Sequence, residues 1–328
     1  MPSDPPAILR LGTRGSLLAR TQSQLVASDL ERLHPGLVVE IVIVKTGGDL
    51  VTEKPLHDIG GKGLFTRELE LALLDGSVDF AVHSYKDVPV TMPLVDVAEL
   101  LIAATPVRED PRDVLAVRDR GVPANASSIV DALPIGATVA TGSLRRRCQL
   151  LARRPDLIVQ PIRGNIDTRL RKLVEGQHDA IVLALAGLRR TRLFDDARMG
   201  ILDPSEMLPA SGQGALALQC RRNDERTRTV LTALHDSATE VCVNAERELV
   251  RKLGGDCHSP IAALATLDGD MMRLRAAVGA RDGGLPIITA SAAAPQAHFA
   301  LVVKECWQLL DGQGVAALLH DGVPPTRP

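Results

Sequence analysis

Apolar and polar residues alternate in blocks along the first half of the chain, in a pattern that predicts strand–helix–strand units. Residues 7–11 are mainly apolar and predict a short strand, and the segment after it carries apolar residues at helical spacing on one face. These residues are Leu18, Leu25, Val26, Leu30 and Leu33. Residues 37–44 form a nearly continuous β-branched and apolar run, which is typical of a buried strand in a parallel sheet. The pattern therefore predicts a βαβ unit.

The pattern continues with another helix and strand and then starts again. Residues 65–74 predict a helix, residues 78–83 a strand, and residues 97–103 an apolar stretch that returns to the sheet. The second half of the pattern begins after Arg108 and has the same order of elements. It comprises strands at 138–140, 157–161 and 180–185 and helices at 143–153 and from Asn165. Two similar α/β domains are predicted, and such domains bind ligands at the carboxyl ends of their strands.

The pattern changes in the last third of the chain. Residues 208–215 are rich in Gly, Pro and Ser and predict a bend, after which the apolar residues 216–218 are expected to cross back to the first domain. A helix at 239–253, a strand at 273–278 and a helix at 298–310 then predict a small α+β domain. The predicted domains are residues 1–107 with 208–232, residues 108–207, and residues 236–328.

Composition restricts the class of protein. The chain has 328 residues, 45% of them hydrophobic, and a formal net charge of -2, so any positive charge is local. Aromatic residues make up only 2%, which leaves few rings on which nucleic-acid bases would stack. The N-terminus lacks the basic and apolar regions of a signal peptide, and no apolar run approaches the roughly 20 residues of a membrane span. We expect a soluble cytoplasmic protein without nucleic-acid or membrane partners.

The cysteines predict neither a metal site nor a disulfide framework. There are five, an odd number, and no C-x-x-C pair. Four lie in or beside apolar segments, where a buried inert thiol is the usual explanation. Cys257 instead lies in a polar, glycine-rich turn. Such a thiol is a candidate nucleophile or attachment point, or is exposed without a role.

Basic residues recur at glycine-containing turns between predicted strands and helices. They are Arg14 in residues 13–16, Lys62 in residues 61–63, Arg145 and Arg146 after Ser143, and Arg163 in residues 163–165. Glycine lets the backbone approach a ligand, and helix N-termini and basic side chains attract anions. The turns therefore predict a pocket for a small polyanion. The alternatives are a helix cap at Ser16 and a solvated or nucleic-acid-binding face at residues 145–147.

Two further segments carry candidate chemistry. His83, Lys86 and Asp87 follow a predicted apolar strand, so they are expected at the functional edge of the sheet. His83 alone favours a satisfied structural residue, whereas Asp87 is an acid among basic turns and a candidate for proton transfer and for stabilising positive charge. The polar stretch 50–61 has glycine near both ends, which favours a closing loop or a plain surface loop.

Together these segments resemble the porphobilinogen deaminase family over about residues 9–280. The resemblance rests on motifs at residues 12–16, 60–65, 81–89, 108–113, 143–146, 163–165, 208–210 and 212–215 and on Cys257. It implies an α/β fold of two domains similar to type II periplasmic binding proteins, with the active cleft between them, and a small α+β C-terminal domain.

The resemblance also implies an activity in tetrapyrrole and heme biosynthesis. Members of the family are cytoplasmic transferases, favoured to be monomers, that carry a dipyrromethane cofactor attached by a thioether to the cysteine matching Cys257. Four porphobilinogen molecules are added head to tail, each with loss of ammonia, and hydrolysis releases hydroxymethylbilane.

The same resemblance implies roles for individual residues. Asp87 is the catalytic carboxylate. Cofactor binding is implied for Cys257, Lys86, Ser143, Arg145, Arg146, Arg169 and Arg190. Substrate binding is implied for Arg14, Ser16 and Arg163, and Lys62 belongs to the closing loop. The growing chain of pyrroles accumulates carboxylates, which need such Arg and Lys partners.

Two other classes of function remain open at this point. A non-catalytic protein that binds small carboxylate anions would explain the basic turns, because the same two-domain architecture serves solute capture. It gives no role to Asp87 or Cys257. Nucleic-acid binding would explain residues 145–147 alone.

Overall fold

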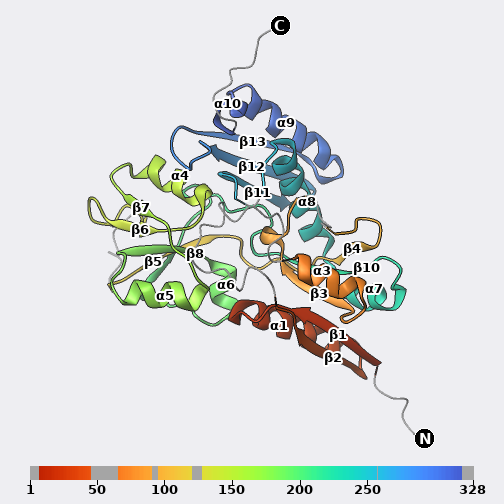
Figure 1. Ribbon diagram of the computed structural model, residues 1–328. Helices are drawn as coiled ribbons and strands as arrows, with labels where there is room; N and C mark the ends of the chain where they lie inside the picture. Colours follow the sequence, from red (N-terminus) through yellow and green to blue (C-terminus); the bar gives the residue numbers. More distant parts are fainter. Residues whose placement is uncertain (1–6, 46–65, 91–94, 120–127, 257, 320–328) are drawn as a thin grey trace, which may run out of the picture. The chain divides into compact units, whose positions relative to one another are not determined.

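Three β-sheets form the framework of the protein in the computed structural model (Figure 1). The structure describes residues 7–45, 66–90, 95–119, 128–256 and 258–319. The chain divides into two compact units. The first comprises residues 1–109 and 215–240, and the second comprises residues 110–214 and 241–328.

The first unit is built on a five-stranded sheet in the order β2-β1-β3-β10-β4. Its strands are β1 (Ala7–Thr13), β2 (Leu37–Ile43), β3 (Phe80–Ser84), β4 (Leu100–Ala104) and β10 (Leu216–Arg221). Strands β2, β1 and β3 are parallel, and β10 is antiparallel to both of its neighbours. The crossing of residues 216–218 back to the first sheet is therefore confirmed. Helices α1 (Leu17–Leu33), α3 (Arg67–Leu74) and α7 (Glu225–Thr232) complete the unit.

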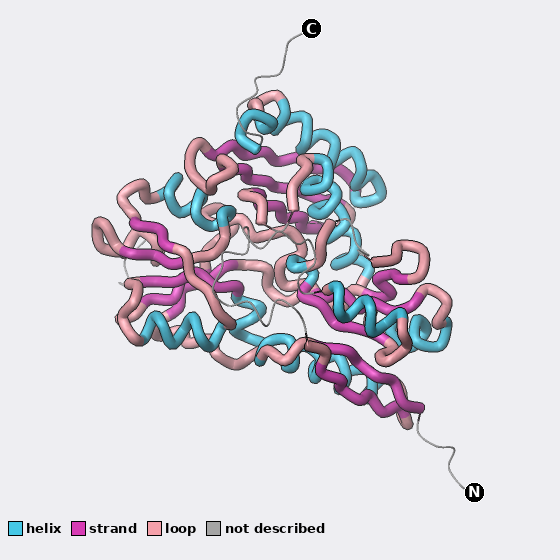
Figure 2. The backbone as a smooth tube through the Cα atoms, in the orientation of Figure 1, coloured by secondary structure: helices cyan, strands magenta, loops and turns pink. Residues whose placement is uncertain are grey.

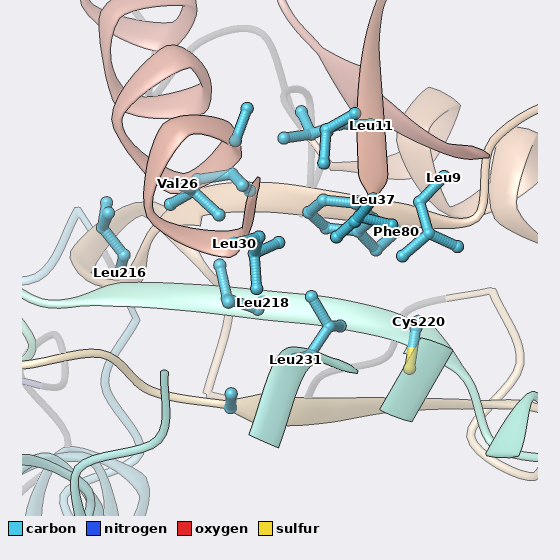
Figure 3. Packing of buried hydrophobic residues seen from close by; sticks show 14 residues of the cluster. Leu9, Leu11, Val26, Leu30, Leu37, Phe80, Leu216, Leu218, Cys220 and Leu231 are labelled. Atoms are coloured by element: carbon cyan, nitrogen blue, oxygen red, sulfur yellow. The ribbon is translucent and has the colours of Figure 1, made fainter. Parts of the chain in front are cut away.

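Helix α1 packs on the sheet through a face that matches the predicted one at Val26 and Leu30 but not at Leu25 and Leu33. Figure 3 shows Val26 and Leu30 of α1 beside Phe80 and Leu218 of the sheet. Leu25 and Leu33, which were predicted on this inner face, are 46% and 40% exposed. Their places are taken by the buried polar residues Gln22 and Ser23. The apolar spacing alone missed this rotation of the helix, because Gln22 occupies a core position with a hydrogen-bond partner, Ser84, and Ser23 is small enough to be buried.

Strand β2 was predicted to be buried on both faces, and this prediction is wrong. Its burial alternates along the first half of the strand, with Leu37 and Val39 buried and Val38 39% exposed. Ile43 at its end is 53% exposed. The strand lies at the edge of the sheet, so one of its faces is only partly covered: Val38 is exposed there, whereas Val42 packs against the core beside α3.

The second unit contains a five-stranded sheet with the same topology, in the order β7-β6-β8-β5-β9. Its strands are β5 (Asp113–Val117), β6 (Thr138–Ala140), β7 (Ile158–Gln160), β8 (Ala180–Ala184) and β9 (Met199–Ile201). Helices α4 (Leu144–Arg153), α5 (Ile166–Val174) and α6 (Leu185–Arg190) follow β6, β7 and β8. In both sheets three parallel strands are followed by an antiparallel strand and then by a fifth strand that runs in the direction of the first three. The predicted fold class of two similar α/β domains is confirmed.

The second unit also contains an antiparallel sheet of three strands with helices packed on it (Figure 2). The strands are β11 (Ile261–Asp268), β12 (Met271–Gly279) and β13 (Ile287–Pro295), and the helices of this part are α8 (Ser237–Lys252), α9 (Phe299–Asp311) and α10 (Val315–Leu319). Of the three strands, only β12 was predicted from the sequence. Strand β13 is rich in Ala and Ser, which have weak strand preference. The α+β character of this region is confirmed. That it forms a domain separate from residues 108–207 stays a prediction.

Helix α4 contacts this three-stranded sheet. A Cβ atom added at Gly279 of β12 would lie 2.5 Å from the Cβ atom of Cys148 in α4, so only glycine fits there. Cys148, Cys220, Cys242 and Cys306 are all buried. Burial raises the pKa of Cys148 to about 11 and those of Cys220 and Cys306 to about 12. The predicted burial of these four thiols is confirmed, and their lack of reactivity stays a prediction.

Within the described ranges, no helix is long and apolar enough to span a membrane.

The inner face of α1 makes a testable prediction. Replacing the fully buried Leu30 with Ala should lower the free energy of unfolding by about 2–5 kcal/mol, because it leaves a cavity between α1 and the sheet. The control is Leu25→Ala on the exposed face of the same helix, for which we expect a loss of at most about 0.5 kcal/mol. Urea denaturation would measure both. Equal losses would contradict the observed orientation of α1.

Candidate active site

In the first unit, candidate residues collect where two neighbouring strands end. Arg14 follows β1, and Lys86 and Asp87 form a short 3-10 turn (Tyr85–Asp87) directly after β3. Strands β1 and β3 are parallel neighbours, so their carboxyl ends lie at the same edge of the sheet. Asp87 is exposed there, whereas Arg14 and Lys86 are half-buried. The predicted position of these three residues at the carboxyl edge is confirmed.

Ser16 has a structural role in this edge. It is the N-cap of α1, and its Oγ atom accepts a hydrogen bond of 3.3 Å from the backbone N–H of Ala19. The capping alternative is therefore confirmed for Ser16. A second contact to a ligand stays a prediction, and a hydroxyl oxygen has the capacity for it.

His83 lies beneath this edge, on β3, and is fully buried by its neighbours. Its Nε2 atom lies 2.9 Å from Oε1 of Gln219. Burial and the positive charge of Arg14 lower the pKa of His83 to about 4, so the ring is neutral at pH 7. The interpretation of His83 as a satisfied structural residue is confirmed.

In the second unit, the N-terminus of α4 carries two buried arginines that share one carboxylate. Nη1 of Arg145 donates to Oδ2 of Asp113 at 2.8 Å, and Nη2 of Arg146 donates to Oδ1 at 2.7 Å. Arg145 and Arg146 are 3% and 6% exposed, and Asp113 is fully buried. A solvated helix face is therefore wrong for these two arginines. Their charges need Asp113, because water does not reach them.

The two guanidinium groups are further fixed by main-chain carbonyls. Arg145 donates to the carbonyl oxygen of Leu208 at 2.6 Å, and Arg146 donates to that of Val182 at 2.9 Å. Gln213 adds a third donor to Asp113, from Nε2 to Oδ1 at 2.9 Å. Each arginine is therefore held from two sides.

The electrostatics of this cluster leave positive charge available. Burial opposes ionisation of Asp113, but the charges of Arg145 and Arg146 outweigh it and hold its pKa well below the usual range. One carboxylate thus faces two guanidinium groups, and one positive charge remains uncompensated among the three side chains. The buried Nε atoms of both arginines have no hydrogen-bond partner among the described residues. These donors and the surplus charge fit an anionic ligand with carboxylate arms, such as a dipyrromethane.

The other basic candidates of this unit also lie at or near strand ends. Arg163 follows β7, and one of its buried terminal nitrogens, Nη2, has no partner within the described part of the chain. Gly164 beside it has φ +108°, and a Cβ atom there would lie 2.7 Å from Thr168. Arg169 of α5 donates from Nε to the carbonyl oxygen of Gly164, and Arg190 of α6 donates to that of Gly214. The turn thus requires glycine and is fixed by Arg169.

Ser143 is the N-cap residue of α4, but among the described residues it makes no side-chain capping bond. Its backbone N–H is instead bonded to Oγ1 of Thr141 at 3.2 Å. Its hydroxyl is therefore not committed to the helix end, which leaves it suited to a ligand. Two other candidates, Lys62 and Cys257, lie outside the described residues, as does the predicted closing loop at 50–61. In the described part of the chain, no cluster of three or more His, Cys, Asp or Glu side chains could hold a metal ion.

Sequence reasoning missed the residues that support the site. Asp113 lies in the motif at residues 108–113, but the sequence predicted no role for it. The hydrogen bonds of Gln213 were not predicted either. The available signal was an acid directly before the wholly apolar residues 114–117 of β5. A charge at that position of a buried strand requires a partner, but the sequence does not show that Arg145 and Arg146 are the partners.

The shared carboxylate predicts a large stability effect. Asp113→Asn should lower the free energy of unfolding by roughly 3–5 kcal/mol, because two buried arginines lose their counter-charge. The control is Asp131→Asn, which removes a partly exposed ion pair with Arg153, another arginine of α4. This variant should lower the free energy of unfolding by less than about 1 kcal/mol. Chemical denaturation would measure both variants. Equal and small losses would show that Asp113 does not balance the arginines.

Comparisons with known proteins give a consistent result. A family model described as "Porphobilinogen deaminase, dipyromethane cofactor binding domain" matches residues 9–229, and one described as "Porphobilinogen deaminase, C-terminal domain" matches residues 240–308. A curated relative from Roseiflexus sp. (strain RS-1), named porphobilinogen deaminase, is 46% identical over 275 residues, covering 84% of this chain and 87% of the relative.

Solved structures show more distant similarity. The VFT2 domain of Bordetella pertussis BvgS is 18% identical with a TM-score of 0.39, and covers 75% of this chain and 93% of that chain. The reduced OxyR regulatory domain from Pseudomonas aeruginosa is 17% identical with a TM-score of 0.37, and covers 70% of this chain and 98% of that chain. The two family models and the curated relative together span both units, and the chain belongs to the porphobilinogen deaminase family.

Proposed function

We propose that the chain is a porphobilinogen deaminase, also called hydroxymethylbilane synthase, a transferase of tetrapyrrole biosynthesis. It joins four porphobilinogen molecules head to tail, releases one ammonia at each addition, and frees hydroxymethylbilane by hydrolysis. The observation that carries the proposal is family membership over most of the chain, together with the anion-binding chemistry of the two sheet edges.

The substrate explains why so many cations are needed. Each pyrrole ring of porphobilinogen carries an acetate and a propionate arm, so every addition brings two more negative charges. We assign cofactor carboxylates to Lys86, Arg145, Arg146, Arg169 and Arg190, with Ser143 as a polar partner. We assign substrate carboxylates to Arg14, Ser16 and Arg163. The buried donors of Arg145, Arg146 and Arg163 support the assignment, because a carboxylate would satisfy them.

The cofactor assignment includes the anchor. We propose that the thiol of Cys257 carries a dipyrromethane through a thioether and that Lys62 belongs to a loop closing over the site. When bound, the dipyrromethane supplies the terminal pyrrole carbon to which the first substrate is joined. The residues around it hold its carboxylate arms and so fix its orientation relative to the incoming ring.

Asp87 is assigned the catalytic role. Its carboxylate lies at the end of β3, next to Lys86, and is exposed in the structure. A carboxylate there stabilises positive charge that develops on a pyrrole nitrogen when ammonia leaves. The same oxygens accept the proton lost from the ring when the new carbon–carbon bond has formed. The basic residues around it bind the arms, so charge stabilisation and substrate binding are separate tasks.

The alternative of a non-catalytic carboxylate-binding protein is not favoured, because it gives no role to Asp87 or Cys257. We further propose that the enzyme acts as a cytoplasmic monomer and does not use nucleic acid. The low aromatic content and the burial of Arg145 and Arg146 support the latter point.

The decisive experiment combines intact mass with turnover. Purified wild-type protein should carry a dipyrrole-sized adduct and release ammonia from porphobilinogen, whereas Cys257→Ser should lack both the adduct and the activity. Cys306→Ala, which alters a buried thiol elsewhere in the second unit, should keep the adduct. An unmodified wild-type protein with full activity would contradict the anchor, and reversible carboxylate binding without ammonia release would support the binding-protein alternative.

The role of Asp87 makes a separate prediction. Asp87→Ala should retain the fold, because an exposed side chain at a strand end adds little packing, but should lower kcat by about 100-fold or more. Asp29→Ala, at an exposed position on α1, is the control and should leave kcat unchanged. Steady-state ammonia release and thermal unfolding would be measured together. Turnover by Asp87→Ala at the wild-type rate would refute the catalytic assignment.

A further inference from the structure

The end of strand β3 that leads into the turn bearing Lys86 and Asp87 is held by polar contacts on both faces of its sheet. Successive side chains of a strand point to opposite faces, so His83 and Ser84 lie on different sides. His83 contacts Gln219 of β10 on one face. On the other face, Oγ of Ser84 lies 3.0 Å from Nε2 of Gln22 in α1. The three preceding residues of β3 are apolar and buried, so the polarity begins only next to the candidate site.

The contact of His83 continues into a buried chain of three side chains. Nε2 of Gln219 donates to Oε1 of Glu70 at 3.2 Å, and Oε2 of Glu70 accepts from the backbone N–H of Val95 at 2.8 Å. Gln219 and Glu70 are fully buried, and His83 is 6% exposed. Glu70 lies in the first turn of α3, so the chain links this helix through β10 to β3.

The chemistry of the three groups fixes the direction of the hydrogen bonds. Both carboxylate oxygens of Glu70 accept hydrogen bonds, so the amide nitrogen of Gln219 faces Glu70. The amide oxygen of Gln219 then faces His83, and it can only accept. His83 must therefore carry its proton on Nε2, and its Nδ1 atom has a free lone pair in the neutral ring.

Burying three hydrogen-bonded polar side chains in the core of a sheet stabilises the fold less than apolar residues there would. Each buried polar group loses its hydration, and only a complete set of partners offsets that loss. Apolar residues at these positions would pack without that cost, as they do in the neighbouring core of the unit. The hydrogen-bonded chain ends at His83, three residues before Lys86, where a small displacement of the strand would move Lys86 and Asp87.

We propose that Gln219 and Glu70 are positioning residues, which hold His83 as the Nε2-protonated neutral ring and thereby fix the end of β3 that presents Lys86 and Asp87. The expected effect of these residues on turnover rests on the proposed function. The predicted tautomer of His83 does not depend on it. Neither Gln219 nor Glu70 belongs to the candidate substrate or cofactor residues.

The first test uses the wild-type protein and does not depend on activity. Nitrogen-15 NMR of the histidine rings at pH 7, with the His83 signal identified by its loss in His83→Gln, should show a single neutral tautomer protonated on Nε2. A ring protonated on Nδ1, or a charged ring, would overturn the proposed direction of the chain.

The second test measures kinetics in three variants. Gln219→Leu removes both hydrogen bonds and should lower kcat at least about tenfold with KM changed less than about twofold, because the substrate contacts remain while the catalytic turn is misplaced. Glu70→Gln keeps an oxygen that accepts from Gln219 but places an NH2 group where the other oxygen accepts from the backbone N–H of Val95, so it should lower kcat less than Gln219→Leu does. Leu218→Ala, on the same strand, removes apolar packing and should destabilise the unit but leave kcat within about twofold below its melting temperature.

The outcomes separate the two proposals. A wild-type enzyme that releases no ammonia refutes the proposed function and leaves the NMR result as the test of the chain. An active wild type in which Gln219→Leu loses no more kcat than Leu218→Ala refutes the positioning role. If Gln219→Leu does not fold, the wild-type tautomer decides, because a His83 ring protonated on Nδ1 would refute the proposed direction of the hydrogen bonds.

Discussion

The buried carboxylate of Asp113 is the interaction on which the basic edge of the second unit depends. Two arginines in the first turn of α4 oppose the helix dipole and are shielded from water, so they need a negative partner within the protein. Asp113 supplies this negative charge from the start of β5. Burial alone would raise the pKa of Asp113, but the charges of the two arginines outweigh that effect and lower it. A single carboxylate fixes both guanidinium groups yet leaves part of their charge for a ligand.

The first unit also places buried polar groups beneath a strand end. His83, Gln219 and Glu70 form a hydrogen-bonded chain below the edge where Arg14, Lys86 and Asp87 lie. In both units the candidate site residues lie in or near the connections after strands, and buried polar groups of the sheet or the adjoining helix support them. Buried hydrogen bonds of this kind restrict the motion of the side chains that they hold.

Much of this arrangement was predictable from residue patterns. The βαβ order, the two similar α/β sheets and the position of the basic turns after β1, β6 and β7 follow from apolar periodicity and glycine placement. The inner face of α1 did not follow, because Gln22 and Ser23 are polar residues in core positions, and the edge position of β2 is hidden in an apolar sequence. Strands β11 and β13 were missed because short alanine-rich segments have no clear periodicity.

The sequence by itself determined the family, the fold class and the residue types needed to bind carboxylates, because these depend on local order and on motifs that can be read along the chain. Only the tertiary structure decided which charges are paired. Asp113 meets Arg145 at a separation of 32 residues, and Gln219 meets Glu70 at a separation of 149. Such pairs form where the folded backbone brings strands and helices together. The sequence around a buried polar residue does not show which distant residue will be its partner.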